Sequence, residues 1–434
     1  MRSLNIVHDT RDTFHGRSVF QAWKKEDFWW SKTTCNQEYN FPTLERSKYG
    51  QESDGNSLNT HINLKDPTIC LDLNWSPDGT SVVTVSNDFG IRQYLVPEEP
   101  GAVLVPFKRF FRAQSIVSSC VHPYYSMFGG NEGVNVMLVS SKDLPIQLFS
   151  LSPHATEHAP LFSYSVVNPE NENYDKVFAL SFFLKSGFLT GSSRNKVSAY
   201  DLNRRIPLWT SSVPSRVSGH RSIVSCFDQG FDSIVSSFRY GATYKNDIFG
   251  IDTRLKSVMP QADKNSLGVK DGNCGIVQLI QSVNQHFLYV VKRNSESIDI
   301  LDIRQGLSKI NELALPFQLD SQKFKASLDS TNGLLIGTSD GRVLQWSSDV
   351  IEFGGLVRTT NPEQGTHLAP DAEYTEYSLE KPKNRINIVA SNPSNPDFIV
   401  SSYSPNKFEE NGEALSGIIT FSLQDQSTPT RSTE

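Results

Sequence analysis

The sequence predicts an all-β fold assembled from one repeated unit of short strands. Runs of β-branched residues alternate with Asn-Gly, Asp-Gly and Pro-Asp-Gly turns along most of the 434 residues. Segments with apolar residues at helical spacing are almost absent. A unit of two short strands and a third strand that ends in an aromatic or aliphatic residue recurs along the chain, and such recurrence is typical of repeat architectures.

The clearest copy of the unit covers residues 69–96. Residues 76–79, Ser-Pro-Asp-Gly, form a turn signal because Pro fixes φ and Gly accepts a positive φ. The β-branched residues at 82–85 then predict a strand. Residues 87–88, Asn-Asp, open the next turn, and residues 91–96 predict the third strand.

A second clear copy covers residues 327–347, where Asn-Gly at 332–333 and Asp-Gly at 340–341 are strong hairpin signals. An acid followed by an aliphatic residue at +3 and an aromatic residue at +6 recurs within the units. Asp in a tight turn accepts hydrogen bonds from its own downstream amides. We therefore predict structural turn roles for Asp88, Asp143 and Asp340.

The ends of the third strands give a common register. The aligned positions are Tyr94, Phe149, Tyr200, Ile251, Leu301, Trp346 and Phe421. The first six lie about 45–55 residues apart, the size of one four-stranded propeller blade. A single such sheet cannot bury both faces, whereas radial stacking and ring closure can. The register predicts a single WD40-type β-propeller of seven blades.

The propeller is expected to span residues 67–423. Residues 1–66 form an N-terminal segment that we expect to dock partly on the propeller, with 14–30 supplying a strand that closes the ring. The tail 424–434 has nothing to bury, which predicts disorder.

Bulk properties indicate an intracellular protein that does not enter membranes. The N-terminus lacks the apolar core of a signal peptide, and no apolar run approaches the roughly 20 residues of a transmembrane helix. The five cysteines are widely spaced and form no Cys-x-x-Cys pair, so we expect reduced thiols without a disulfide or a metal. They are Cys35, Cys70, Cys120, Cys226 and Cys274.

Common motifs of catalysis are absent from the sequence. The chain has no Gly-x-x-x-x-Gly-Lys loop, no nucleophile elbow and no His-Glu-x-x-His pair. We therefore predict a non-enzymatic protein with no cofactor. A protein of this kind works by binding other macromolecules.

Charge points to one segment as a binding site. The whole chain has a net charge of −6, yet residues 185–256 contain 11 Lys and Arg against five acids. Arg with interleaved aromatics suits RNA phosphates and unstacked bases. We predict one RNA-binding positive surface; the alternative is a solvated rim of unneutralised charges. The residues chosen for it are Arg194, Lys196, Arg204, Arg205, Arg239, Tyr240 and Lys245.

Four stretches between residues 67 and 350 resemble the WD-repeat family of the telomerase Cajal body protein, and within it the fungal nuclear branch associated with pre-mRNA splicing. The stretches are 70–96 with its Ser-Pro-Asp-Gly turn, 140–148 (Ser-Ser-Lys-Asp-Leu-Pro-Ile-Gln-Leu), 174–183, and 222–226 followed by Arg-Tyr-Gly at 239–241. Their order and spacing carry the resemblance more than any one motif does.

The resemblance implies a nuclear scaffold that assists pre-mRNA splicing and helps the small nuclear ribonucleoprotein to hold the 5′ splice site. Implied partners are that particle, splicing proteins and small nuclear RNA, bound by a monomer within larger complexes. Two alternatives stay open: an RNA-binding chaperone for telomerase or Cajal-body ribonucleoprotein assembly, and a protein adaptor such as a substrate receptor of a ubiquitin ligase.

Overall fold

The computed structural model describes residues 2–3, 5–10, 68–112, 114–155, 159–167, 173–184, 186–213, 222–229, 236–262, 274–319, 324–329, 333–347, 356–358, 366–368, 374–378, 384–405 and 416–422. Within these ranges the chain is built from strands and has no α-helix. Two 3₁₀ turns, η4 (Glu132–Val134) and η5 (Ile303–Gln305), are present. The predicted all-β class is confirmed.

The first three sheets are antiparallel, and each uses four consecutive strands. The first consists of β3 (Cys70–Trp75), β4 (Ser81–Ser86), β5 (Gly90–Leu95) and β6 (Pro106–Phe111). The second consists of β7 (Ile116–Val121), β8 (Val136–Ser141), β9 (Ile146–Ser150) and β10 (Phe162–Tyr164). The third consists of β11 (Val177–Phe183), β12 (Gly187–Ser192), β13 (Lys196–Asp201) and β14 (Trp209–Ser212).

The next eight strands form one sheet with two antiparallel halves, joined by parallel pairing of β15 with β19. The first half is β15 (Val224–Gln229), β16 (Phe238–Thr243), β17 (Ile248–Asp252) and β18 (Ser257–Ala262). The second half is β19 (Gly275–Gln281), β20 (Phe287–Arg293), β21 (Ser297–Asp302) and β22 (Ser308–Ala314).

The last two large sheets each include a strand from the N-terminus. One contains β23 (Ser327–Leu328), β24 (Leu334–Gly337), β25 (Arg342–Trp346), β28 (Tyr374–Ser378) and β1 (Arg2–Ser3). The other contains β29 (Arg385–Ser391), β30 (Phe398–Ser404), β31 (Gly417–Ser422) and β2 (Asn5–Asp9). A separate ribbon pairs β26 (Leu356–Arg358) with β27 (Thr366–Leu368).

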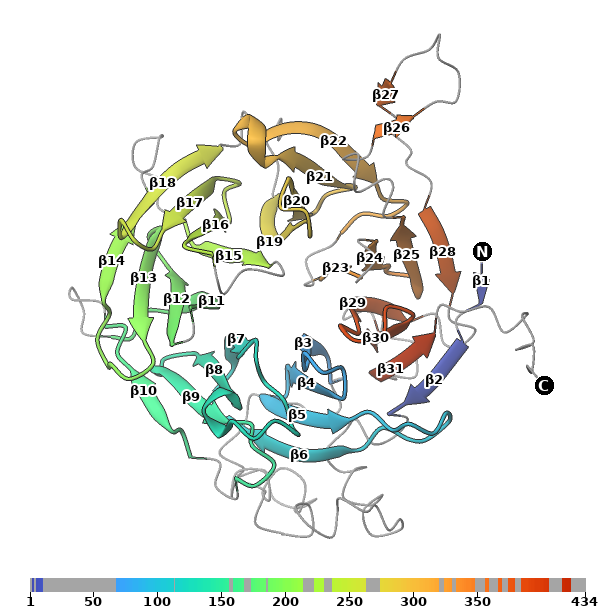
Figure 1. Cartoon of the computed structure of the whole chain (residues 1–434), viewed down its shortest axis with the longest axis horizontal. Helices are drawn as coiled ribbons and strands as arrows, with labels where there is room; N and C mark the ends of the chain where they lie inside the picture. Colours follow the sequence, from blue (N-terminus) through green and yellow to red (C-terminus); the bar gives the residue numbers. More distant parts are fainter. Residues whose placement is uncertain are drawn as a thin grey trace, which may run out of the picture.

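The sheets follow one another around a common centre in a propeller-like arrangement, with the first strand of each sheet innermost (Figure 1). All seven aligned positions of the sequence register fall in the third strand of a sheet, and each of these side chains is buried. Hydrophobic clusters fill the space between successive sheets; for example, Val85 and Ile91 of the first sheet pack with Met137 and Phe149 of the second. Burial between sheets explains why strands such as β4 have no exposed residue.

Innermost strands share a local irregularity. The register shifts after the first or second residue in six of them, for example between Cys70 and Asp72 in β3 and between Ile276 and Gln278 in β19. One extra residue in a strand increases its twist and redirects the following side chain. In β19 the redirected Gln278 accepts a hydrogen bond from the Ala326 amide and donates one to the Ala326 carbonyl, each at 2.9 Å.

Contacts of the same kind join the last sheet to the first. Asn387 of β29 donates to the Cys70 carbonyl of β3 at 2.8 Å, and Trp75 Nε1 donates to the Ala390 carbonyl at 3.0 Å. Lys325 forms an ion pair with Asp72, and Ser119 of the second sheet donates to the same carboxylate at 2.9 Å. Polar side chains thus tie together sheets that are far apart in sequence.

The N-terminal strand β2 pairs antiparallel with β31 and covers its outer edge. It is supplied by residues 5–9, whereas the expected closing segment 14–30 lies outside the described residues. Buried His8 fixes this strand: its Nδ1 lies 2.8 Å from Thr420 Oγ1, and its Nε2 donates to the Glu99 carbonyl at 3.0 Å. One imidazole therefore contacts both the last sheet and the β5–β6 connection.

Other expectations concern thiols, termini and membranes. Cys70, Cys120, Cys226 and Cys274 are free thiols, and burial raises the pKa of Cys70 to about 12. Cys35 and the tail 424–434 lie outside the described residues. Within the part of the chain that the structure describes, no helix is long and apolar enough to cross a membrane.

The burial of His8 predicts that the stability of the protein depends on pH. Burial lowers its pKa below the ordinary value of 6.5. As the pH falls from 7 towards 5, the unfolded chain takes up a proton at His8 before the folded chain does, so the free energy of unfolding decreases. The stability that neutral His8 contributes is fully present above pH 6.5, the pKa of His8 in the unfolded chain. It is lost as the pH falls through the lower pKa of His8 in the folded chain. Urea unfolding should therefore show a weaker pH dependence for His8→Gln than for the parent; identical slopes would contradict this account.

Candidate macromolecule-binding surface

Successive sheets present their turns at two ends, which we call face 1 and face 2. Face 1 carries the turns between second and third strands. Face 2 carries the turns between first and second strands and those between third and fourth strands. In the third sheet, for example, residues 193–195 precede β13 and residues 202–208 follow it, so they lie at opposite ends of that strand.

Hydrogen bonds confirm that equivalent turns of neighbouring sheets lie together. The Asn195 amide, in the β12–β13 turn, donates to the Ser222 carbonyl at 2.8 Å. The adjacent Ile223 carbonyl accepts from the Tyr244 amide, in the β16–β17 turn, at 3.0 Å. Asn246 in that second turn then donates to the Cys274 carbonyl, just before β19, at 2.8 Å. Face 1 is therefore continuous from the third sheet to β19.

The structure places Asp88, Asp143 and Asp340 in turns between second and third strands, on face 1. Asp88 accepts from the Gly90 amide at 3.0 Å and pairs with the buried Arg92. Exposed Asp340 accepts from Thr338 Oγ1 and pairs with Arg342 at 2.7 Å. Asp143 has a positive φ of 58° and is exposed.

Two members of the predicted RNA-binding set do not reach the surface. The Arg239 side chain is 1% exposed; its Nε pairs with Asp228 at 2.6 Å, and its guanidinium also donates to the Phe182 carbonyl at 3.1 Å. Tyr240 is buried in the cluster between the two halves of the eight-stranded sheet. Both lie in β16, the second strand of its sheet, where neighbours cover both sides. Choosing them for RNA contact was wrong.

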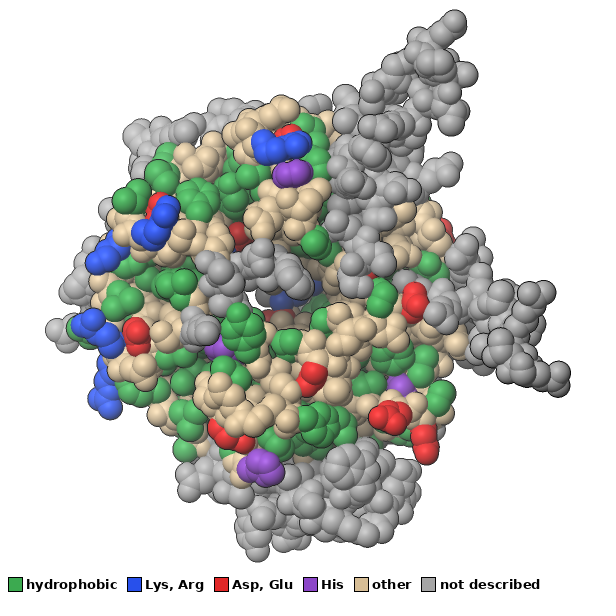
Figure 2. Space-filling model, in the orientation of Figure 1, with side chains coloured by type: hydrophobic (Ala, Val, Ile, Leu, Met, Phe, Trp, Pro, Cys, Tyr) green, Lys and Arg blue, Asp and Glu red, His purple; other side chains and the backbone are tan. Residues whose placement is uncertain are grey.

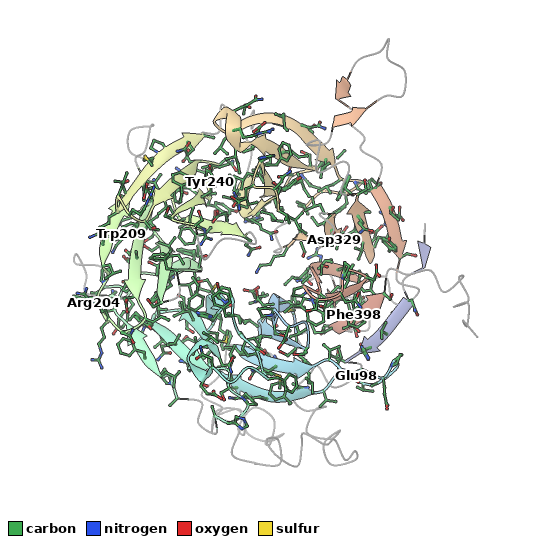
Figure 3. All side chains as sticks on the ribbon, viewed as in Figure 1. Glu98, Arg204, Trp209, Tyr240, Asp329 and Phe398 are labelled. Carbon is green, nitrogen blue, oxygen red and sulfur yellow. The ribbon has the colours of Figure 1, made fainter. Side chains whose placement is uncertain are left out.

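The exposed members of that set lie on different faces. Arg194 and Lys245 are exposed on face 1, where half-buried Lys196 pairs with Asp175 at 3.2 Å. Arg204 and Arg205 are exposed beyond the far end of β13, about 17 Å along a strand of this length. Figure 3 shows Arg204 at the outer rim, with Tyr240 farther in. The expectation of one positive surface made from all these residues was therefore also wrong.

A different set of cations gathers on face 2, in the turns between third and fourth strands of three consecutive sheet units. We call it the basic arc; its residues are Arg204, Arg205, Arg254, Lys256 and Arg304, all exposed. Figure 2 shows Lys and Arg side chains along this side of the molecule, over the sheets that contain β13, β17 and β21. The described residues of these turns contain no exposed Asp or Glu side chain.

The three third strands that lead into the basic arc, β13, β17 and β21, each end in an Asp that fixes the following turn. Asp201 accepts from the Asn203 amide at 2.8 Å, Asp252 from the Arg254 amide at 2.9 Å, and Asp302 from the Arg304 amide at 2.8 Å. A hydrogen bond from the Leu255 amide lowers the pKa of Asp252, and one from Arg304 lowers that of Asp302. The carboxylates of Asp252 and Asp302 therefore favour the ionised form, and all three carboxylates hold the turns that present the cations.

Exposed aliphatic side chains lie beside the basic arc. We call Leu184, Ile206, Leu208, Leu255 and Val283 the aliphatic set, and each belongs to a turn on face 2. Leu255 is 70% exposed and Ile206 is 60% exposed. Exposed apolar side chains next to Arg, such as Ile206 and Leu255, are typical of surfaces that bind other proteins.

Acidic side chains occupy another part of face 2. Glu98 and Glu99, between β5 and β6, and Glu132 in η4 are exposed. Figure 2 shows Asp and Glu side chains on this side, across the molecule from the basic arc. Among the described residues, the cations of the basic arc and these three acids therefore lie on opposite sides of face 2.

Sequence reasoning overlooked Arg304 and did not select Arg254 or Lys256. The signal was present, because an Asp follows the third-strand mark at 201, 252 and 302, and a cation comes two or three residues later. Counting charge along one segment obscured this pattern, since neighbouring cations in the sequence alternate between opposite ends of a strand.

The fold and the surface define a class: an all-β, propeller-like repeat protein with a charged and apolar turn face. No protein-family model matches the chain. Three of its relatives are each named Protein SWT21. That of Eremothecium gossypii is 36% identical over 97% of this chain and 100% of its own length. That of Kluyveromyces lactis is 39% identical, covering 94% and 96%. A Saccharomyces cerevisiae relative is 36% identical, covering 78% and 97%.

The chain belongs to the fungal Protein SWT21 family, because the similarity extends over nearly the full length of both sequences.

The buried pair of Arg239 and Asp228 gives a prediction about stability. Asp228→Ala leaves the Arg239 guanidinium buried without its carboxylate, which should lower the free energy of unfolding by about 3–5 kcal/mol. Arg204→Ala, at the exposed rim, should change it by no more than about 0.5 kcal/mol. Guanidinium unfolding checks both values. A small effect of Asp228→Ala would show that Arg239 reaches solvent.

Proposed function

We propose that residues 67–423 form a single seven-bladed propeller of the WD40 type, with the N-terminal segment partly docked on it and 424–434 as a disordered tail. Support comes from the four-stranded antiparallel units that follow one another around the centre and from the seven buried third-strand marks. Pairing of β2 with β31 also fits, because rings of this kind protect the edges of their last sheet.

We propose further that the protein is a nuclear, non-enzymatic scaffold that assists pre-mRNA splicing and helps the small nuclear ribonucleoprotein to stay at the 5′ splice site. The resemblance of the four stretches between 67 and 350 to the splicing-associated branch of WD-repeat proteins supports this role. One structural observation carries the scaffold function: Ile206, Leu208 and Leu255 of the aliphatic set occupy the same turns of face 2 as cations of the basic arc.

Under this proposal the protein works as a monomer within a larger complex and needs no cofactor. Its partners are splicing proteins of the small nuclear ribonucleoprotein, bound on face 2. Contact with small nuclear RNA would involve the exposed cations of face 1, Arg194 and Lys245, which lie in neighbouring turns.

The test is genetic. In the fungal host, deletion of this chain should raise the ratio of unspliced to spliced transcripts, measured by RNA sequencing. Restoring the parent should return the ratio to normal. Arg204→Glu with Arg254→Glu and Lys256→Glu should fail to restore it, because the changes reverse the charge of the basic arc without removing a buried contact.

The matched control is Lys142→Glu with Lys176→Glu, which reverses two exposed charges that belong to neither proposed binding site. We expect this variant to retain more activity than the face 2 variant. Unchanged splicing in the deletion strain would refute the proposed role.

A further inference from the structure

We propose that the basic arc and the aliphatic set together bind an acidic protein segment that also carries aliphatic residues. This inference rests on the proposed scaffold function and specifies the chemistry of its partner on face 2.

Charge indicates the acidic component. The β17–β18 turn presents Arg254 and Lys256, and the side chain of Arg254 is 73% exposed although it lies 3.5 Å from Asp252. The β13–β14 turn presents Arg204 and Arg205. Cations that line one side of a face attract a partner of opposite charge and orient it.

Aliphatic residues indicate the apolar component and favour protein over RNA. Ile206 follows Arg205 directly, and Leu255 lies between the two cations of its turn, so apolar and basic contacts alternate. Sequence-tolerant RNA binding uses exposed aromatic rings on which bases stack. The described residues of the turns that make up the arc contain no exposed Phe, Tyr or Trp side chain. Burying Leu and Ile is favourable only against an apolar partner.

The turns are held in place before any partner binds. The Asp252 carboxylate accepts from the Arg254 and Leu255 amides, at 2.9 and 3.1 Å. In the third sheet, the Arg205 carbonyl accepts from the Ser165 amide at 3.0 Å, and the Arg205 guanidinium lies 5.7 Å from the centre of the Phe162 ring. A surface that is ordered in advance loses less conformational entropy on binding.

Fluorescence anisotropy with three labelled probes tests the partner's chemistry: a peptide of Glu and Leu, a peptide of Glu and Ser with the same charge, and poly(U) RNA. We expect the Glu/Leu peptide to bind the full chain at least about tenfold more tightly than the Glu/Ser peptide. Ile206→Ser with Leu255→Ser should weaken Glu/Leu binding by about tenfold, as should Arg204→Glu with Arg254→Glu and Lys256→Glu.

Two controls lie away from the basic arc: Ile6→Ser, which removes a 42% exposed apolar side chain of β2, and Arg194→Glu with Lys245→Glu on face 1. Neither should change the affinity for the Glu/Leu peptide, and all variants should keep the melting temperature of the parent within a few degrees.

Three results would overturn the proposal: no binding of the Glu/Leu peptide, equal binding of the two peptides, or tighter binding of poly(U) that depends on the basic arc but not on Ile206 and Leu255. The splicing measurement in the deletion strain is independent of these probes. It can therefore fail while peptide binding holds, or hold while peptide binding fails.

Discussion

The structure depends on the contacts that join its first and last sheets. Every sheet buries both faces against neighbours, so a sheet at an open end would expose one of them. Residues of β3 and β29–β31 share one hydrophobic cluster, and the hydrogen bond from Asn387 to the Cys70 carbonyl links residues that are 317 positions apart. Pairing of β2 with β31 then covers the remaining edge, which would otherwise be free to pair with another chain.

Contacts over such sequence distances have energetic consequences. Loop-closure entropy opposes them, and hydrophobic burial and polar contacts must offset it. Several of the polar groups involved are largely buried, such as the Lys325–Asp72 pair and His8. Removing one partner from a buried pair is costly. The same rigidity fixes the turns, so the scaffold can hold exposed residues in place without help from a bound partner.

The binding function that we propose depends on turns. The strand-end carboxylates Asp201, Asp252 and Asp302 have a structural task, yet they determine which side chains point outward. Arg254 and Leu255 are presented by the same turn, whose amides both bond to Asp252. Because the strand-end Asp recurs in neighbouring sheet units, the turns that follow it present similar positive charges.

The sequence by itself determined the all-β class, the position of the third strands and the turns that contain Asp88, Asp143 and Asp340, because strand pattern and turn chemistry act over a few residues. The tertiary structure decided which charges meet. Arg239 looked like its neighbours in sequence, but it lies in a second strand and pairs with Asp228 in the interior. Arg194 and Arg204 are ten residues apart, yet one strand carries them to opposite ends. Arg204 and Arg254 are fifty residues apart, but they belong to equivalent turns and therefore lie on the same face. The physical reason is that the stacking of sheets in a repeat fold, and not the order of the chain, determines which residues are neighbours on the surface.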